Sequence, residues 1–241
     1  DGSVYDPDQE TTDFPSYDEN VFWYIYGNMA MVVLNSDYWY APAHSMVKHT
    51  SGNVHGYVMD NQLEWLRRTI TQLETNVNID HIFVTIHTPA FPNGGHAKDD
   101  MWYDGNNLVR PYVAGKPVEK GIIERRDEIL DILINQSKKT VALLTGDEHN
   151  YSRMRIDNET IMYPEDYPHE KLSISRTFWQ ITNGAAGAPY YAQEQLPWSG
   201  DVEKFSTQFA VVFFHVNGDK IKIRVWNPDT LELIEEFDLV S

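Results

Sequence analysis

Two segments of the sequence repeat the same order, an amphipathic helix pattern followed by a short apolar run. Apolar residues recur at helical spacing over residues 60–75, and the run HIFVTI follows at 81–86. The second copy has a helical pattern over residues 121–136 and the run TVALLT at 140–145. Successive helix–strand units favour neighbouring parallel strands that are joined by crossover helices. The sequence therefore predicts an α/β sheet at the centre of the chain.

Strands of another kind are predicted on both sides of this centre. Two apolar runs flank Gly27 and Asn28, which indicates a β-hairpin. A second hairpin is predicted about Asn217 and Gly218, and a last strand is predicted near 231–239. Because the C-terminal part should be antiparallel, we expect mixed sheets and a mixed α/β (α+β) fold.

The net charge of the chain limits its partners. Nineteen basic and 36 acidic residues give a formal charge of −17, which repels nucleic acid phosphates, so no nucleic acid binding is expected. An anionic substrate would need a local positive charge, for which a bound cation is the obvious source. The chain has no cysteine, which excludes thiolate metal sites. It also has no apolar run of about 18 residues, so no membrane span is expected.

Polar side chains follow both apolar runs of the repeated unit. His87 comes directly after the first run, and Asp147, Glu148 and His149 follow Gly146 after the second. Ligands gather at the carboxyl ends of such strands, and in an extended segment Asp147 and His149 would share a side that Glu148 does not. With nine histidines and 36 acidic residues, about one acidic-x-His pair is expected by chance. The position of Asp147 and His149 directly after a buried strand, and not their spacing alone, therefore indicates a metal site.

Four stretches of the sequence match blocks of one known family. They are QLEWLRRTI, HIFVTIHTPAF, TVALLTGDEHNYSRM and WQITNGAAGAPYY. The most specific part is a Gly-[His/Asp]-x-His-x-Tyr-x-Arg block that follows a His-x-Pro block by about sixty residues. Together these stretches resemble the C-terminal half of a calcineurin-like metallophosphoesterase, the superfamily that includes the purple acid phosphatases. The resemblance implies a sandwich of two mixed β-sheets flanked by helices.

The resemblance also implies roles for five residues. His87 and Asp147 would bind one metal ion, and His149 would bind a second. His96 would contact the substrate phosphate, and Arg153 would either neutralise substrate charge or brace the loop. Asp147 stands where most members have a histidine, and a carboxylate favours harder ions over a nitrogen-rich zinc site. Two divalent or trivalent ions are therefore expected, with Fe, Mn, Zn, Mg and Ca all open.

Three earlier blocks of the family have no counterpart in the sequence. Asp-x-His, Gly-Asp-x-x-Asp and Gly-Asn-His-[Asp/Glu] supply the bridging aspartate, the asparagine ligand and the proton-donating histidine. YGNMAM begins like the third block, but Met29 stands at the histidine position. We therefore expect the chain to be the C-terminal half of a single catalytic domain, completed by a preceding segment or a companion chain. Within it we expect an acidic entry loop at 1–20, metal-site strands and helices at 21–190 and antiparallel strands at 191–241.

The function implied by the resemblance is hydrolysis of a small phosphoester at a binuclear metal centre. This chain would supply about half of the ligands. A phosphodiesterase or nucleotidase is as open as a phosphomonoesterase, because substrate choice depends on loops such as 90–120. The alternative from another class is a catalytically silent structural or interaction protein that retains the fold. We also expect a secreted or periplasmic location.

The alternation of side chains after the second apolar run gives a first test. We expect Asp147→Asn to lower the metal content of the protein more than Glu148→Gln does, because only Asp147 should face the other ligands. Elemental analysis of both purified variants measures this difference. Equal losses would contradict the alternation argument.

Overall fold

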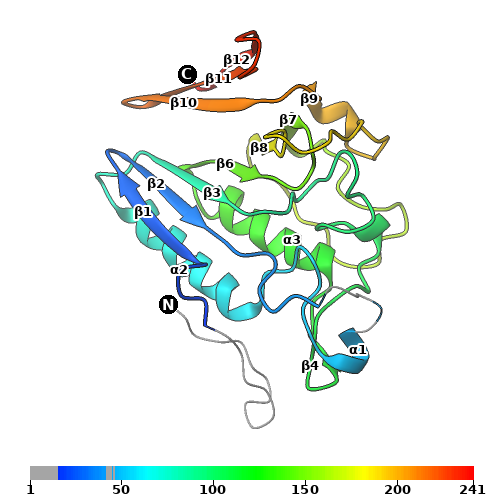
Figure 1. The fold of residues 1–241 in the computed structure, drawn as a ribbon. Helices are drawn as coiled ribbons and strands as arrows, with labels where there is room; N and C mark the ends of the chain where they lie inside the picture. Colours follow the sequence, from blue (N-terminus) through cyan, green and yellow to red (C-terminus); the bar gives the residue numbers. More distant parts are fainter. Residues whose placement is uncertain (1–15, 42–44, 46) are drawn as a thin grey trace.

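A seven-stranded mixed sheet forms the middle layer of the molecule (Figure 1). This computed structural model describes residues 16–41, 45 and 47–241, so residues 1–15 of the expected entry loop lie outside the described residues. The strands of the seven-stranded sheet, in spatial order, are β1 (Phe22–Tyr26), β2 (Met29–Val33), β3 (His81–Thr85), β6 (Thr140–Thr145), β8 (Phe178–Asn183), β7 (Tyr151–Ile156) and β9 (Val202–Ser206). The four central strands β2, β3, β6 and β8 are parallel, and the other three pair antiparallel. The expected hairpin about Gly27 and Asn28 is confirmed by the pairing of β1 with β2.

Two helices cover one face of this sheet (Figure 1). The helix α2 (Asp60–Thr75) connects β2 to β3, and α3 (Ile122–Leu130) connects β3 to β6, continuing as a π-helical turn over Asp131–Asn135. Both connections join adjacent parallel strands and move in the same direction across the sheet. Because such crossovers are almost always right-handed, both helices lie on the same face. The repeated helix–strand prediction is confirmed.

The other helical and strand elements are short and lie in the connecting loops. They are α1 (Val47–Thr50), β4 (Tyr112–Val113), β5 (Lys116–Pro117) and two single-turn 3-10 helices, Tyr103–Gly105 and Ser199–Asp201. Among the described residues, no helix has the length and apolar character needed to cross a bilayer.

A second sheet covers the opposite face of the middle layer (Figure 1). It consists of β10 (Val211–Asn217), β11 (Lys220–Trp226) and β12 (Leu233–Val240), which pair antiparallel in that order. The C-terminal hairpin and final strand are thus confirmed. Within the described residues this sheet is antiparallel and not mixed, because short turns join its consecutive strands, and such turns permit only antiparallel pairing. The chain has a mixed α/β sandwich with helices on one outer face.

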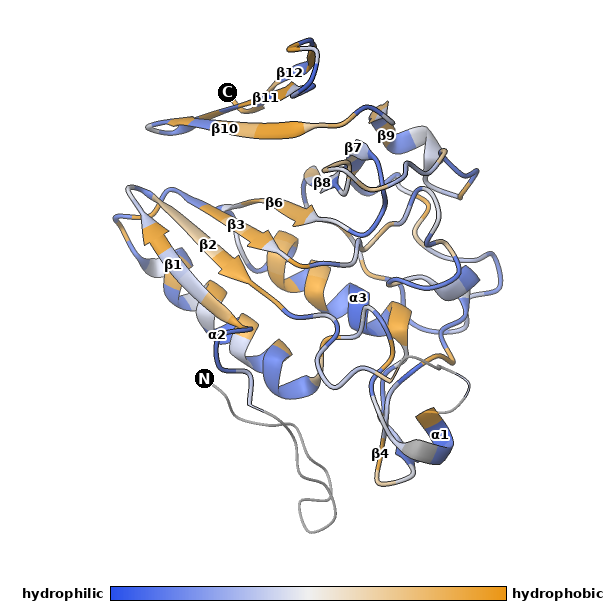
Figure 2. Ribbon diagram, viewed as in Figure 1, coloured by the Kyte–Doolittle hydropathy of each residue, from blue (hydrophilic) through white to orange (hydrophobic). Residues whose placement is uncertain are grey.

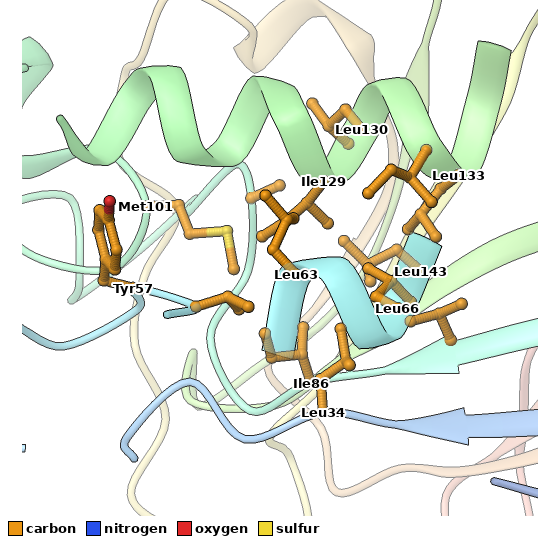
Figure 3. Close-up of a cluster of buried hydrophobic side chains, with 14 of the residues drawn as sticks. Leu34, Tyr57, Leu63, Leu66, Ile86, Met101, Ile129, Leu130, Leu133 and Leu143 are labelled. Atoms are coloured by element: carbon orange, nitrogen blue, oxygen red, sulfur yellow. The ribbon is translucent and has the colours of Figure 1, made fainter. Parts of the chain in front are cut away.

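The central strands are buried on both faces. In β3, Ile82 and Val84 belong to the apolar cluster under the helices, whereas Phe83 packs on the second sheet, with its ring 5.1 Å from that of Phe214. The strands β2, β3 and β6 consist mainly of apolar residues, and each helix has apolar residues on one side (Figure 2). Leucine and isoleucine side chains fill the space between α2 and α3 (Figure 3). A continuous apolar run is what a strand covered on both faces requires, and this double packing fixes the position of the strand ends.

Candidate metal centre

The ends of β3 and β6 bring His87 and Asp147 together. The strands are parallel neighbours, and Gly146 donates a backbone hydrogen bond of 2.9 Å to the carbonyl oxygen of His87. This pairing continues the ladder beyond the strands and sets the two side chains beside each other. His87 Nε2 lies 3.1 Å from Asp147 Oδ1.

Asp147 is the central residue of a tight turn. Glu148 donates a backbone hydrogen bond of 2.8 Å to Gly146, and Asp147 between them has a φ of 62°. A γ-turn with positive φ is rare and strained, and strain of this kind collects at functional sites. The turn aims the Asp147 carboxylate at the histidines.

The same turn changes the expected relation between Asp147 and His149. The expectation of a shared side assumed an extended backbone, which the turn at Asp147 replaces. His149 Nδ1 lies 2.6 Å from the carbonyl oxygen of Pro189, and its ring stacks on Tyr191 at 4.2 Å between centroids. His149 is still near the centre, because its ring lies 6.5 Å from that of His96.

Glu148 is fully buried, and its carboxylate lies against the backbone of the loop that carries His96. One of its carboxylate oxygens accepts backbone hydrogen bonds from Asn93 at 3.0 Å and Gly94 at 2.9 Å. Burial raises its pKa above the ordinary value. Glu148 therefore fixes the loop that carries His96, and Glu148→Gln tests that loop as well as the metal content.

A third histidine, His55, reaches Asp147 from a loop that the sequence analysis did not single out. His55 Nε2 lies 2.7 Å from Asp147 Oδ2, and His55 Nδ1 lies 2.5 Å from Asp37 Oδ1. The loop approaches closely because Gly56 follows, with a φ of 82°; a Cβ at Gly56 would lie only 2.7 Å from the backbone oxygen of Asp100. In the sequence, only the neighbouring Gly56 could have marked His55 as a site residue, and a glycine beside a histidine is weak evidence.

The loop after β3 adds His96 and two further carboxylates. His96 Nδ1 lies 3.1 Å from Asp99 Oδ1, and His96 Nε2 lies 3.7 Å from Asp147 Oδ1. Asp100 is completely buried, and neither of its carboxylate oxygens has a hydrogen-bond partner among the described residues. His55 Nε2 is 3.2 Å from Asp100 Oδ1. Burial raises the pKa of Asp100 well above its ordinary value.

Arg153 is held between the two sheets. Its guanidinium group pairs with Glu235 at 2.8 Å and Glu203 at 2.7 Å, and it lies over the rings of Phe237 and Trp179. These contacts favour the bracing role over contact with substrate, and a catalytic role for Arg153 stays a prediction without a contact to support it.

The charges of the cluster are strongly coupled. Burial would lower the pKa of His55, but the carboxylates of Asp100, Asp147 and Asp37 outweigh burial and raise that pKa to about 12. Burial would raise the pKa of Asp147, but hydrogen bonds from His55 and His87 hold it well below its usual range. The hydrogen bond to Asp147 also raises the pKa of His87. The imidazole and carboxylate groups of the cluster therefore favour each other's charged forms.

The donor atoms fit a divalent cation. Three imidazole rings and two carboxylates, those of Asp147 and Asp100, converge from three loops, and the fully buried Asp100 carboxylate pairs with the His55 ring. Ion-binding sites in proteins commonly combine these ligand types. A cation here would offset buried negative charge that the protein otherwise balances with protons.

Two solved structures share this fold. GAP50, described as the anchor in the inner membrane complex of Plasmodium, aligns with a TM-score of 0.56 and 11% identity over 91% of this chain and 54% of that chain. The purple acid phosphatase PPD1 from yellow lupin (Lupinus luteus) seeds aligns with a TM-score of 0.54 and 10% identity over 90% of this chain and 32% of that chain.

These alignments define the class of fold and its extent. The chain has a metallophosphoesterase-like fold, and it spans about half the length of GAP50 and about a third of the lupin enzyme. No family model matches the sequence, and no curated protein matches it.

The raised pKa of His55 predicts a pH dependence of stability. Protonation of His55 contributes to the stability of the folded state because the pKa is higher in the folded than in the unfolded protein. The contribution is complete below the unfolded pKa of 6.5 and is lost as the pH rises toward the folded pKa of about 12. In chelator-treated protein, we expect the free energy of unfolding to fall between about pH 7 and about pH 9 and to fall less in His55→Gln. Urea titrations at both pH values measure this, and equal slopes in the two proteins would contradict it.

The environment of Arg153 predicts a structural effect. Arg153→Met removes the ion pair of the largely buried Glu235 carboxylate and leaves it only the hydrogen bond from the Tyr151 hydroxyl, so it should lower the free energy of unfolding by about 3 kcal/mol. The matched control is Arg155→Met on the same strand, where the side chain is 36% exposed and should contribute at most about 1 kcal/mol. Denaturant titration measures both, and a loss of metal binding in folded Arg153→Met would favour a role at the metal centre.

Proposed function

We propose that this chain is part of a metal-dependent phosphoester hydrolase. The observation that carries the proposal is the group of histidines around Asp147, which lies at the carboxyl ends of β3 and β6, where ligands of such sheets bind. The fold that holds this group is shared with a purple acid phosphatase. The chain's strong negative charge also agrees with a cation as the means of binding an anionic ester.

The proposed roles follow the position of each side chain. His87 and Asp147 would hold one metal ion, and His149 would hold a second, since its Nε2 is not used in the contact with Pro189. His96 donates a hydrogen bond from Nε2 to a phosphoryl oxygen while Asp99 orients its other nitrogen. Bound metal ions supply polarised phosphoryl oxygens and a water of lowered pKa. Water would replace one alcohol on phosphorus, which releases that alcohol and leaves phosphate from a monoester or a phosphomonoester from a diester.

We further propose that the remaining ligands come from outside these 241 residues. The two-metal centre needs a bridging carboxylate, which the recognised motifs of this chain do not supply. A preceding segment or companion chain would provide it, with residues 1–241 forming the C-terminal half of a single domain. The partial coverage of both structural relatives supports this arrangement. A monoester, a diester and a nucleotide are all open as substrates, and a secreted or periplasmic location stays a prediction.

A second candidate function is a non-catalytic interaction protein. GAP50 has a similar fold and is described as an anchor, so this architecture also occurs in a protein with that role. In that case the histidine and carboxylate cluster would serve stability, and the protein would lack turnover with any added metal.

Activity measurements separate the two functions. With Mn, Fe or Zn and a chromogenic phosphoester, we expect little turnover by residues 1–241 and restored turnover when the upstream segment is supplied. His96→Ala in the restored protein should lower kcat by roughly 100- to 1,000-fold, as loss of one donor to a developing anion does, whereas the exposed control His215→Ala should not. Absence of turnover under every condition would favour the interaction protein. Full turnover by residues 1–241 with no effect of the upstream segment would contradict the proposed division of ligands.

A further inference from the structure

We propose that His55, Asp100 and Asp147 bind one divalent transition-metal cation. Neither His55 nor Asp100 belongs to a recognised motif of the sequence. One ligand atom from each of the three residues lies within 4.8 Å of the others. The residues come from separate loops, so the convergence is a property of the tertiary fold and not of local sequence.

Asp100 is the strongest sign of a ligand at this position. Its side chain is fully buried, and among the described residues neither oxygen accepts a well-aligned hydrogen bond; its carboxylate has only an ion-pair contact with His55. A buried carboxylate without donors is costly unless a cation or a proton compensates it. Its Oδ1 lies 3.2 Å from His55 Nε2, so it faces the same point as the other two ligands.

The orientation of His55 is the second sign. Asp37 lies 2.5 Å from Nδ1 and fixes the ring, while Nε2 faces Asp147 and Asp100. Histidine ligands in metal sites usually have a carboxylate behind the ring in this way, which fixes the tautomer and orients the free nitrogen. Asp37 therefore acts as a positioning residue for His55.

The donor set indicates the class of ion. Two carboxylates alone would suit Mg²⁺ or Ca²⁺, whereas an imidazole nitrogen shifts the preference toward Mn²⁺, Fe²⁺ or Zn²⁺. His87 lies next to the group, with Nε2 3.1 Å from Asp147 Oδ1, and adds a further nitrogen in reach. We therefore expect a site of mixed nitrogen and oxygen ligands that is contained in this chain.

This inference concerns the cluster that the proposed hydrolase uses, but it does not require turnover. The test is equilibrium binding of Mn²⁺ to residues 1–241, measured by calorimetry and by the electron paramagnetic resonance signal of free Mn²⁺. We expect one ion per chain that His149→Gln does not remove. If binding is found without phosphoesterase activity, the site stands and the proposed function fails.

Variants identify the ligands. His55→Gln and Asp100→Asn should each weaken Mn²⁺ binding by more than the roughly 10- to 100-fold loss expected for Asp37→Asn, which removes only the carboxylate behind His55. The controls are His215→Gln, an exposed histidine on β10, and Asp229→Asn, an exposed aspartate in the turn between β11 and β12. Both controls should bind Mn²⁺ like the wild type.

Two outcomes would overturn the proposal. The first is a Mn²⁺ affinity in His55→Gln and Asp100→Asn within about twofold of the wild type. The second is an equal loss of affinity in Asp229→Asn, which would show that the effect is not specific to the proposed ligands. Circular dichroism of chelator-treated variants shows whether each is folded. If His55→Gln does not fold, Asp37→Asn and Asp100→Asn still decide the question, because unchanged binding in both excludes the site.

Discussion

The carboxylate of Asp147 holds the candidate centre together. It contacts histidines from three parts of the chain, at 2.7 Å for His55, 3.1 Å for His87 and 3.7 Å for His96. Asp147 can do this because its strained turn directly follows β6, a strand buried between the helices and the second sheet. Rigid packing on both faces of the strand supports the strain of the turn. The loops that carry His55 and His96 are less regular, and buried side chains fix them: Asn53 bonds the backbone near His55, and Glu148 bonds the backbone near His96.

Local pattern was sufficient to predict most of the fold. Helical spacing and apolar runs predicted α2, α3, β3 and β6, because burial of one helix face and of both strand faces leaves a direct record in the sequence. The same reasoning predicted that His87 and Asp147 would lie at one edge of the sheet. The second sheet differs from the expected mixed sheet, because its strands pair only antiparallel within the described residues.

Other parts of the site had no local pattern to reveal them. His55 lies 92 residues before Asp147, in a loop with no periodicity, so only the folded chain shows that they meet. Asp100 is one of 36 acidic residues, and nothing in its neighbours marks it as buried. The expected shared side of Asp147 and His149 was based on extended backbone, which the φ of 62° at Asp147 does not have.

The absence of a side chain at Gly56 allows the loop of His55 to lie directly against the loop of Asp100. Any side chain there would place its first carbon 2.7 Å from the backbone oxygen of Asp100, closer than carbon and oxygen can lie. The loop of His55 would then have to move away from the loop of Asp100, although neither functional side chain had been altered. The distance between His55 and Asp100 is thus determined by the main-chain contact at Gly56. The attraction between the two side chains would not restore that distance once the contact was lost.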